Sequence, residues 1–324
     1  MIGVGLMGRR HAENLARRVE EACLVAVSDA DRASSETVAS ALGATSCESA
    51  DALLARDDVR AVVIASPARF HAEHAIAAAL AGKDVFVEKP IATSLADADR
   101  AIAAARQSGV RLQVGFQRRF DPPYVEARRI VASGELGRPA FYRGINRDRS
   151  SPAGVPGSMA HDDILTESLI HDLDGARWML GDEVAGVRAS LATIGDAANA
   201  PAPNLAVVQL RFARGAVAHV EGLRGARYAY DIRSEIVCES GAVFVGGFAQ
   251  TTLTVLRQSE PREDLSPGFL ERYADGYLAE MRDFVAGVRD RRPPAVTGTD
   301  GRIALAIAKA AARSATDERE VSVA

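Results

Sequence analysis

The sequence predicts two domains of different class: an N-terminal α/β domain on a parallel sheet, and a C-terminal α+β domain with a mainly antiparallel, open-faced sheet. Up to about Phe116, short apolar runs alternate with alanine-rich amphipathic stretches, as in βαβ units. Beyond Phe116, apolar runs follow one another with short glycine-containing connections, as in antiparallel sheets. The 324 residues, 48% of them hydrophobic, suffice for two cores. We therefore expect domains at 1–118 and 119–324.

In the first domain, four runs are almost continuous in apolar residues, as expected of parallel strands that helices cover on both faces. These strand candidates are Leu24–Ser28, Ala61–Ala65, Val85–Val87 and Leu112–Phe116. The stretches between them are rich in Ala and Leu and predict crossover helices. The helix candidates are Arg10–Val19, Ala33–Leu42, Ala72–Ala81 and Leu95–Ser108.

In the second domain, the predicted strands are Ala140–Asn146, Val187–Thr193, Leu205–Phe212, Ala216–Leu223, Ile232–Cys238 and Thr252–Leu256. Two long helices, Ile164–Leu180 and Leu270–Arg289, and a third after Thr299 are expected to cover one face of this sheet. The other face then needs a cover, and a twin subunit is the usual one. The Ser/Pro/Gly-rich segment Asp148–Ser158 is predicted to be a loop over a site.

Composition narrows the class of partner. The net charge of -4 and pI near 5.9 favour neither nucleic acid nor an anionic membrane surface. Cys23, Cys47 and Cys238 have no CxxC spacing, which argues against a disulfide framework and a zinc site, so packing is their expected role. Without a run of about 20 apolar residues or a signal-like start, we expect a cytoplasmic protein that binds a small molecule.

The first residues carry a dinucleotide-binding signature. Gly3-Val4-Gly5-Leu6-Met7-Gly8 matches GxGxxG and leads into a helical stretch, so backbone amides can approach a pyrophosphate without Cβ atoms in the way. Asp29 ends the next strand candidate, where its carboxylate can bind an adenosine ribose and would repel a 2′-phosphate. This Rossmann pattern favours NAD over NADP. NADP remains the alternative cofactor, because Arg32 lies close to Asp29 in the sequence.

The first strand is short. Only Met1 and Ile2 precede Gly3, whereas the strand that leads into such a loop is normally about five residues long. We expect that a few more apolar residues precede Met1 in the natural chain.

A series of motifs resembles the Gfo/Idh/MocA family of oxidoreductases over essentially the whole chain. The motifs are Ala65-Ser66-Pro67 with Phe70-His71, Ala79-Leu80-Ala81-Gly82-Lys83, Val85-Phe86-Val87-Glu88-Lys89-Pro90, Gly115-Phe116-Gln117-Arg118-Arg119-Phe120-Asp121, Glu167-Ser168-Leu169-Ile170-His171-Asp172-Leu173-Asp174, Tyr228-Ala229-Tyr230-Asp231-Ile232 and Asp300-Gly301-Arg302. Within the family they look most like those of inositol 2-dehydrogenases. The resemblance implies oxidation of myo-inositol to its 2-keto form with NAD, and a homotetramer or homodimer.

The expected chemistry assigns roles to three residues. Oxidation of a secondary alcohol requires a base for the hydroxyl proton, and His171 is the candidate. Glu167 lies four residues earlier, on the same helix face, and can orient the imidazole. Lys89 follows a strand end, where its ammonium can stabilise alkoxide charge. The alternative for His171 is a histidine that only packs in the core. The alternative for Glu167 is an ordinary ion pair on a helix, and the alternative for Lys89 is a solvated surface charge.

The resemblance also implies further site residues. A cis peptide precedes Pro90, Glu88 lies near the nicotinamide ribose, Ser66 and Pro67 border the cofactor, and His71 belongs to the cofactor-side motif. Family positions that line the substrate pocket correspond to Arg118, Asp174 and Tyr230, with a salt bridge as the alternative role of Arg118.

Some positions depart from the inositol dehydrogenase pattern. Glu167 stands where those enzymes usually have Asp, and Asn146 and Asp148 stand where they tend to have His and Asn. Because a site built around hydroxyl groups discriminates by its donors and acceptors, the substrate is open among inositol isomers, inositol derivatives and pyranoses.

Other functions remain open. A pyranose or anhydro-sugar dehydrogenase or reductase of the same family, with NAD or NADP, would share the catalytic residues. A non-catalytic regulator that senses a dinucleotide would not need both Lys89 and His171. No metal is expected, because the pair His71 and His74 has no evident third ligand and His161-Asp162-Asp163 fits a solvated loop before a helix.

Overall fold

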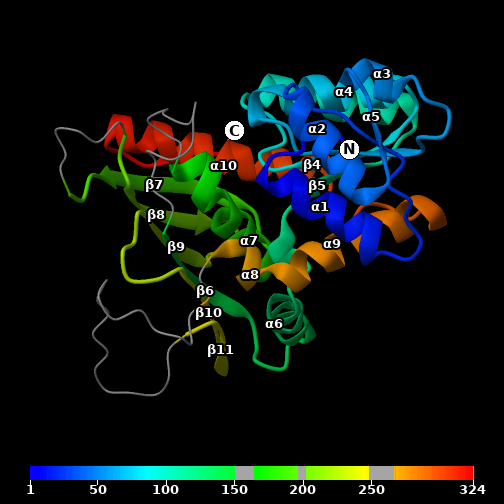
Figure 1. Cartoon of the computed structure of the whole chain (residues 1–324). Coiled ribbons are helices and arrows are strands. Elements are labelled where there is room, and N and C mark those ends of the chain that lie inside the picture. The colour runs from blue at the N-terminus through cyan, green and yellow to red at the C-terminus, as the bar shows by residue number, and fades with distance from the viewer. Residues whose placement is uncertain (150–163, 196–201, 248–265, 267, 324) are drawn as a thin grey trace. The chain divides into compact units, whose positions relative to one another are not determined.

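The computed structural model describes residues 1–149, 164–195, 202–247, 266 and 268–323 (Figure 1). The predicted strand Thr252–Leu256, the segment His161-Asp162-Asp163 and most of the predicted loop after Asp148 lie outside the described residues. None of the described helices is long and apolar enough to cross a membrane.

The chain forms two compact units. Unit 1 comprises Met1–Phe120 and Asp275–Leu305, and unit 2 comprises Asp121–Ala274 and Ala306–Ala324. This division differs from the expected uninterrupted domain 119–324, because helix α9 (Ala274–Asp290) belongs almost entirely to unit 1. The reason is packing: Met281 and Phe284 of α9 are buried in the unit 1 core. The predicted helix Leu270–Arg289 is therefore divided: its first residues, up to Ala274, belong to unit 2, and the rest belongs to unit 1.

Unit 1 has the predicted α/β architecture with parallel strands. Its strands are β1 (Ala26–Val27), β2 (Thr45–Ser46), β3 (Ala61–Ile64), β4 (Asp84–Glu88) and β5 (Leu112–Gly115). Its helices before residue 120 are α1 (Leu6–Arg17), α2 (Arg32–Leu42), α3 (Ala50–Leu54), α4 (His71–Leu80) and α5 (Leu95–Ser108). The pairs β1–β2, β3–β4 and β4–β5 are parallel. The predicted helix over 95–108 has the same bounds in the structure.

Ile2 connects the two groups of strands in unit 1. It forms parallel bridges to Ser28, just after β1, and to Ile64, the last residue of β3. The amide of Gly3 then donates to the carbonyl of Ser28 at 2.8 Å. The short N-terminal segment thus occupies the central position from which a dinucleotide-binding loop emerges.

Unit 2 contains a seven-stranded mixed sheet in the order β11-β10-β6-β9-β8-β7-β12. The strands are β6 (Pro139–Asp148), β7 (Val184–Ala192), β8 (Leu205–Phe212), β9 (Val217–Arg224), β10 (Asp231–Cys238), β11 (Gly241–Val245) and β12 (Val321–Ser322). All neighbours are antiparallel except β6 and β9. The predicted fold class, with a mainly antiparallel sheet, is confirmed.

One face of this sheet carries helices. The helical segment α7 (Ile170–Leu180) packs on β6 and β9, preceded by a π-helical turn at Ile164–Leu169. Unit 2 also contains α6 (Pro122–Ser133) and α8 (Phe269–Arg272), and α10 (Gly298–Asp317) begins in unit 1 and ends in unit 2.

The opposite face of the sheet is open. On β8, Val208 and Leu210 are buried whereas Gln209 and Arg211 are exposed, as expected when helices cover one face alone.

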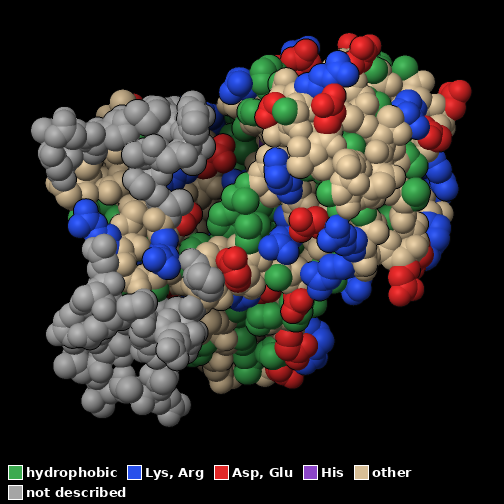
Figure 2. All heavy atoms as spheres, viewed as in Figure 1, with side chains coloured by type: hydrophobic (Ala, Val, Ile, Leu, Met, Phe, Trp, Pro, Cys, Tyr) green, Lys and Arg blue, Asp and Glu red, His purple; other side chains and the backbone are tan. Residues whose placement is uncertain are grey.

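The predicted packing role of the cysteines fits Cys238, which is buried, but not Cys23, which is exposed. Positive and negative side chains are interspersed on the face of the molecule that Figure 2 shows.

Candidate functional site

The unit 1 candidates lie where parallel strands end. Gly3 follows Ile2, Asp29 comes two residues after β1, Ser66 comes two residues after β3, and Lys89 directly follows β4. Because the carboxyl ends of parallel strands share one edge of a sheet, these residues belong to the edge where open α/β sheets bind ligands. Arg118, three residues after β5, is buried at the same edge.

The glycine loop is shaped by close backbone contacts. Gly3 has φ +86°, and a Cβ there would lie 2.5 Å from the amide nitrogen of Ser66. A Cβ at Gly8 would overlap the carbonyl group of Gly3. A Cβ at Gly5, by contrast, would meet no described atom within 4 Å, and no side chain among the described residues caps the N-terminus of α1. The loop therefore leaves the amides of the α1 N-terminus accessible to an anion.

Asp29 is held in place by the backbone around it. Its Oδ2 accepts from the amide of Val4 at 2.7 Å, and its Oδ1 accepts from the amide of Asp31 at 2.9 Å. The side chain is half-buried. Arg32, the residue that keeps NADP open, forms an exposed ion pair with Glu36 at 2.7 Å. A fixed carboxylate next to the glycine loop suits a ribose diol.

Two histidines of α4 organise the loop after β3. The ring nitrogens of His71 lie 2.7 Å from the carbonyl oxygens of Ser66 and Pro90. Burial lowers the pKa of His74, whose Nδ1 lies 3.0 Å from the hydroxyl of Ser66. Through these two contacts, His71 connects the turn after β3, which carries Ser66, with the turn after β4, which carries Lys89. Pro67 lies between Ser66 and the short helical turn that precedes α4.

Glu88 supports the turn that carries Lys89. Its Oε1 lies 2.7 Å from Nε2 of His11, and its Oε2 accepts from the amide of Lys89 at 3.1 Å. The Lys89–Pro90 peptide is cis, as the resemblance implies. A Cβ at Gly115 would lie 3.1 Å from Oε2 of Glu88, so the glycine leaves room for this carboxylate.

A second acid, Glu280, completes this buried cluster. Within the described part of the chain, the His, Cys, Asp and Glu groups that could hold a metal ion consist of His11, Glu88 and Glu280, whose ligand atoms lie within 4.8 Å of one another. Burial raises the pKa of Glu280 well above its ordinary value, and the charges of Glu88 and Asp283 raise it further. Burial also acts to raise the pKa of Glu88, but the hydrogen bond and charge of His11 bring it below the ordinary value.

In unit 2, the candidate acid and base lie at a break in helical geometry. Glu167 belongs to the π-helical turn and His171 to the first turn of α7, and both side chains are partly exposed. The π turn is a departure from the predicted continuous helix Ile164–Leu180. A Cβ at Gly222 of β9 would lie 2.6 Å from Leu169, so this glycine lets the turn approach the sheet. Such π turns often occur at functional sites.

Asn146 connects strand β6 with α7. Its Nδ2 donates to Oδ2 of Asp172 at 2.9 Å and to the carbonyl of Ser168 at 3.3 Å. Asp172 is completely buried, and Asn146 is buried as well. These contacts give Asn146 a positioning role for the segment between Glu167 and His171.

Two further unit 2 candidates, Asp148 and Tyr230, lie at the same end of the sheet. Asp148 ends β6 and lies opposite Arg224 of β9 in the register of the two strands. The Nε of Arg224 donates to Ser168 Oγ at 2.7 Å. Tyr230 immediately precedes β10, which starts opposite Arg147. Tyr230 and Asp174 are both buried.

Four residues that organise these sites were not predicted from the sequence: His11, Glu280, Asp172 and Arg224. A signal existed for Glu280, an acid among the apolar residues Leu278, Met281 and Phe284 of one helix. His11 carried a similar signal, three residues after the glycine motif in an amphipathic helix. Their partners, however, are distant in the sequence.

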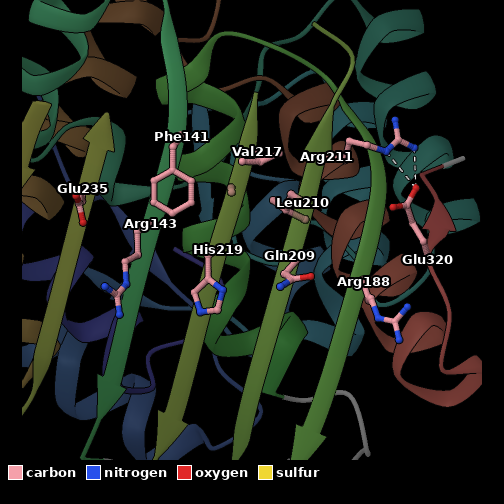
Figure 3. Close-up of a pocket in the computed structure, with 11 residues that line it drawn as sticks. Phe141, Arg143, Arg188, Gln209, Leu210, Arg211, Val217, His219, Glu235 and Glu320 are labelled. Carbon is pink, nitrogen blue, oxygen red and sulfur yellow. Dashed lines mark hydrogen bonds and ion pairs between the residues drawn. The ribbon is translucent and has the colours of Figure 1, made fainter. Parts of the chain in front are cut away.

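The open sheet face of unit 2 is hollowed. A hollow of about 790 Å³ lies over neighbouring strands of this sheet, and Figure 3 shows residues that line it. The labelled residues are Phe141, Arg143, Arg188, Gln209, Leu210, Arg211, Val217, His219, Glu235 and Glu320. None of these is a residue of the predicted cofactor or substrate site, so this surface is separate from the strand-end candidates of unit 2.

Two family models match the chain. Residues 1–116 match the oxidoreductase family model with an NAD-binding Rossmann fold, and residues 124–244 match the C-terminal domain model of GFO/IDH/MocA proteins. These matches confirm the family resemblance of the sequence motifs.

Known relatives span nearly the whole chain. The scyllo-inositol 2-dehydrogenase (NAD(+)) of Bacillus subtilis is 34% identical, with 97% of this chain and 92% of the relative covered. The myo-inositol 2-dehydrogenase of Thermotoga maritima is 35% identical, with 100% and 97% covered. The crystal structure of Lactobacillus casei scyllo-inositol dehydrogenase with bound NAD(H) and scyllo-inositol has a TM-score of 0.88 at 26% identity, with 99% and 97% covered.

Proposed function

The chain belongs to the Gfo/Idh/MocA family of NAD-dependent oxidoreductases, and from this premise we propose that it oxidises a secondary ring hydroxyl of a cyclic polyol, myo-inositol or a related inositol. The observation that carries the proposal is the alignment of Gly3, Asp29, Ser66 and Lys89 at the ends of successive parallel strands. Relatives named as inositol dehydrogenases support the substrate class.

The residues of unit 1 fit an NAD molecule. The uncapped N-terminus of α1 offers amides for the pyrophosphate, the crowding at Gly3 and Gly8 keeps the loop tight, and Asp29 offers a carboxylate for the adenosine ribose. Ser66, Pro67, His71 and Glu88 would border the nicotinamide half. When bound, NAD accepts the hydride from the carbinol carbon.

Residues of the chain remove the hydroxyl proton and stabilise the charge on the oxygen. His171 takes the hydroxyl proton, Glu167 orients the imidazole, and the Lys89 ammonium stabilises the negative charge that develops on the oxygen. As the proton and the hydride leave, the carbinol becomes a ketone. Arg118, Asp148, Asp174 and Tyr230 are proposed to bind the other hydroxyl groups, with Asn146 placing the Glu167–His171 segment.

A substrate panel tests the proposal. Inositol isomers and pyranoses are incubated with NAD or NADP, and absorbance of the reduced nicotinamide is followed for the wild type, Lys89→Ala and His171→Ala. Loss of either group should lower kcat by about 10²–10⁴-fold. Lys83→Ala is the control, because the Lys83 ammonium donates to the carbonyl of Arg56. Retention of full activity in both site variants would contradict the proposed roles of Lys89 and His171.

The preference for NAD is proposed to depend on Asp29. Replacing it by Asn removes the charge that binds a ribose and repels a 2′-phosphate, so affinity for NAD should fall about tenfold, because hydrogen bonds to charged groups contribute about 1.5–3 kcal/mol. Asp31→Asn is the matched control, since Asp31 caps α2 through the amide of Ala33. An unchanged ratio of NAD to NADP affinity in Asp29→Asn would show that another group selects the cofactor.

A second candidate substrate class is supported by Asn146. Its amide nitrogen donates to Asp172 and Ser168. The hydrogen-bond donors that this end of β6 offers to a substrate therefore differ from those of an inositol dehydrogenase with His and Asn at these two positions. This difference favours a pyranose or anhydro sugar as the alternative. Activity with pyranoses alone in the panel would support it, and NAD binding without any turnover would favour a regulator.

We further propose that the open sheet face of unit 2 binds a second copy of the chain, as in a dimer or tetramer. Phe244 is 67% exposed and Val217 is 47% exposed on strands of this sheet. Cationic Arg143, Arg188 and Arg211 share the face with Glu221 and Glu235. A face that carries both charge signs and apolar groups can pair with itself about a twofold axis.

A further inference from the structure

The buried cluster of His11, Glu88 and Glu280 carries an inference beyond the roles above. The three residues come from α1, the end of β4 and α9, and all three are buried, with Glu280 at 0% exposure. No described hydrogen-bond partner contacts either carboxylate oxygen of Glu280. His11 packs against the rings of Phe86 and Tyr277, with centroids at 5.5 and 5.9 Å. The surroundings are therefore apolar.

Two ionised carboxylates in such surroundings are costly. A buried charge needs a partner, and the hydrogen bond of His11 is directed to Glu88. The same carboxylate accepts from the amide of Lys89. Besides Glu88 and His11, the charged groups that act on the cluster are Lys89, His71 and Asp283. Two carboxyl groups that share one site favour one proton between them.

We propose that Glu280 is a positioning residue that carries a proton at neutral pH, so that the charge of the cluster stays on Glu88 and holds the Lys89 turn. The effect on NAD binding rests on the proposed function, whereas the protonation of Glu280 and the hold on the Lys89 turn are properties of unit 1 itself. Glu280 acts through Glu88 and does not touch the substrate.

A metal ion is the competing occupant of the cluster. The three ligands are one histidine and two carboxylates, whereas structural zinc sites take four protein ligands, most often with cysteine. The 2.7 Å separation of His11 and Glu88 is already that of a short charge-assisted hydrogen bond. These features favour a proton in the cluster over a metal.

The test compares three changes at α9. Glu280→Gln keeps the shape and a hydrogen-bond donor without a proton to lose, Glu280→Met removes the polar group at similar volume, and Asp275→Asn is an exposed control on the same helix. Infrared spectra at pH 7 should show a protonated-carboxyl band in the wild type and in Asp275→Asn that is missing in both Glu280 variants. Absence of such a difference would overturn the proposal.

Binding of NAD provides the second measurement. Glu280→Met places an apolar group beside the charged Glu88 and should weaken NAD binding on the order of tenfold through a displaced Lys89 turn, whereas Glu280→Gln should restore most of the affinity. Equal affinities in the Met and Gln variants would overturn the positioning role. Stoichiometric metal in the purified wild type, lost in both variants, would overturn the assignment of a proton to Glu280. If the wild type has no dehydrogenase activity, the proposed function fails while these two measurements still decide the role of Glu280.

Discussion

At the scale of single residues, the glycine loop shows how backbone geometry selects an amino acid. Gly3 combines a positive φ with a Cβ position that is blocked by the backbone of Ala65 and Ser66. Backbone atoms cannot rotate away as a flexible side chain can, so the constraint is steric as well as conformational. The motif therefore fixes a close approach of two strand-end turns in addition to a phosphate site.

Replacing Gly3 by Ala tests this point. The variant should unfold at lower temperature and lose NAD binding by at least about tenfold, since a displaced loop moves the amides away from the pyrophosphate. Gly43→Ala is the matched control, because Gly43 has a similar φ of +68° but its Cβ would meet no atom within 4 Å. It should cost about 1 kcal/mol of stability and leave NAD affinity unchanged. Similar losses in both variants would mean that φ alone sets the requirement.

At the scale of elements, α7 is fixed to the sheet by polar contacts that depend on glycines. Gly222 and Gly144 leave room for Leu169 and Asp172, and Asn146 then donates to the Asp172 carboxylate. The position of the π turn, and with it Glu167, follows from these contacts between segments that are distant in the sequence.

Substitutions at Asn146 and Asp172 test the hydrogen bond between them. Asn146→Ala should lower the free energy of unfolding by about 1–3 kcal/mol, because the buried Asp172 loses a donor. Asn146→Asp should be worse, since it places two carboxylates together. Adding Asp172→Asn to Asn146→Asp restores a donor and an acceptor and should recover part of the loss in a double-mutant cycle. Asn204→Ala, which removes two exposed hydrogen bonds with the backbone of Ile194, is the control. Strict additivity would exclude coupling between 146 and 172.

Helix α9 should give unit 1 a pH-dependent stability. The raised pKa of Glu280 means that the folded chain keeps a proton that the unfolded chain loses above about pH 4.3, the ordinary value for Glu. The stabilisation is complete below that pH and is lost as the pH rises through the folded pKa, with a slope of up to about 1.4 kcal/mol per pH unit.

Urea unfolding at several pH values measures this linkage. Glu280→Gln has no such proton, so its midpoint should rise relative to that of the wild type as the pH increases from 5 to 8, a range chosen from about the ordinary pKa upward. Asp275→Asn should follow the wild type. Parallel pH profiles of wild type and Glu280→Gln would contradict the assigned charge state.

At the scale of the whole molecule, the open sheet face is the surface proposed to build an oligomer. Stable interfaces bury about 1,600 Å² in total and centre on apolar groups. Val217 and Phe244 are exposed apolar residues on this sheet. Figure 3 shows Val217 between Phe141 and Arg211 of the two neighbouring strands.

Charge introduced on this face should disrupt the assembly. Val217→Asp and Phe244→Asp should shift the protein to a smaller species in light scattering coupled to size-exclusion chromatography, because a buried unpaired carboxylate is costly. Leu80→Asp is the control, since Leu80 is 72% exposed on α4 of unit 1. An unchanged mass for both sheet variants would place the interface elsewhere or indicate a monomer.

The sequence by itself determined the two fold classes, most strands and helices, and the strand-end residues of the dinucleotide site. These features follow from local patterns: glycine spacing, alternation of apolar residues and helix-forming stretches. The tertiary structure decided the return of α9 to unit 1, the cluster of His11, Glu88 and Glu280, the hydrogen bond of Asn146 to Asp172, and the π turn before His171. Each depends on contacts between residues far apart in the chain, whose partners a local pattern does not identify.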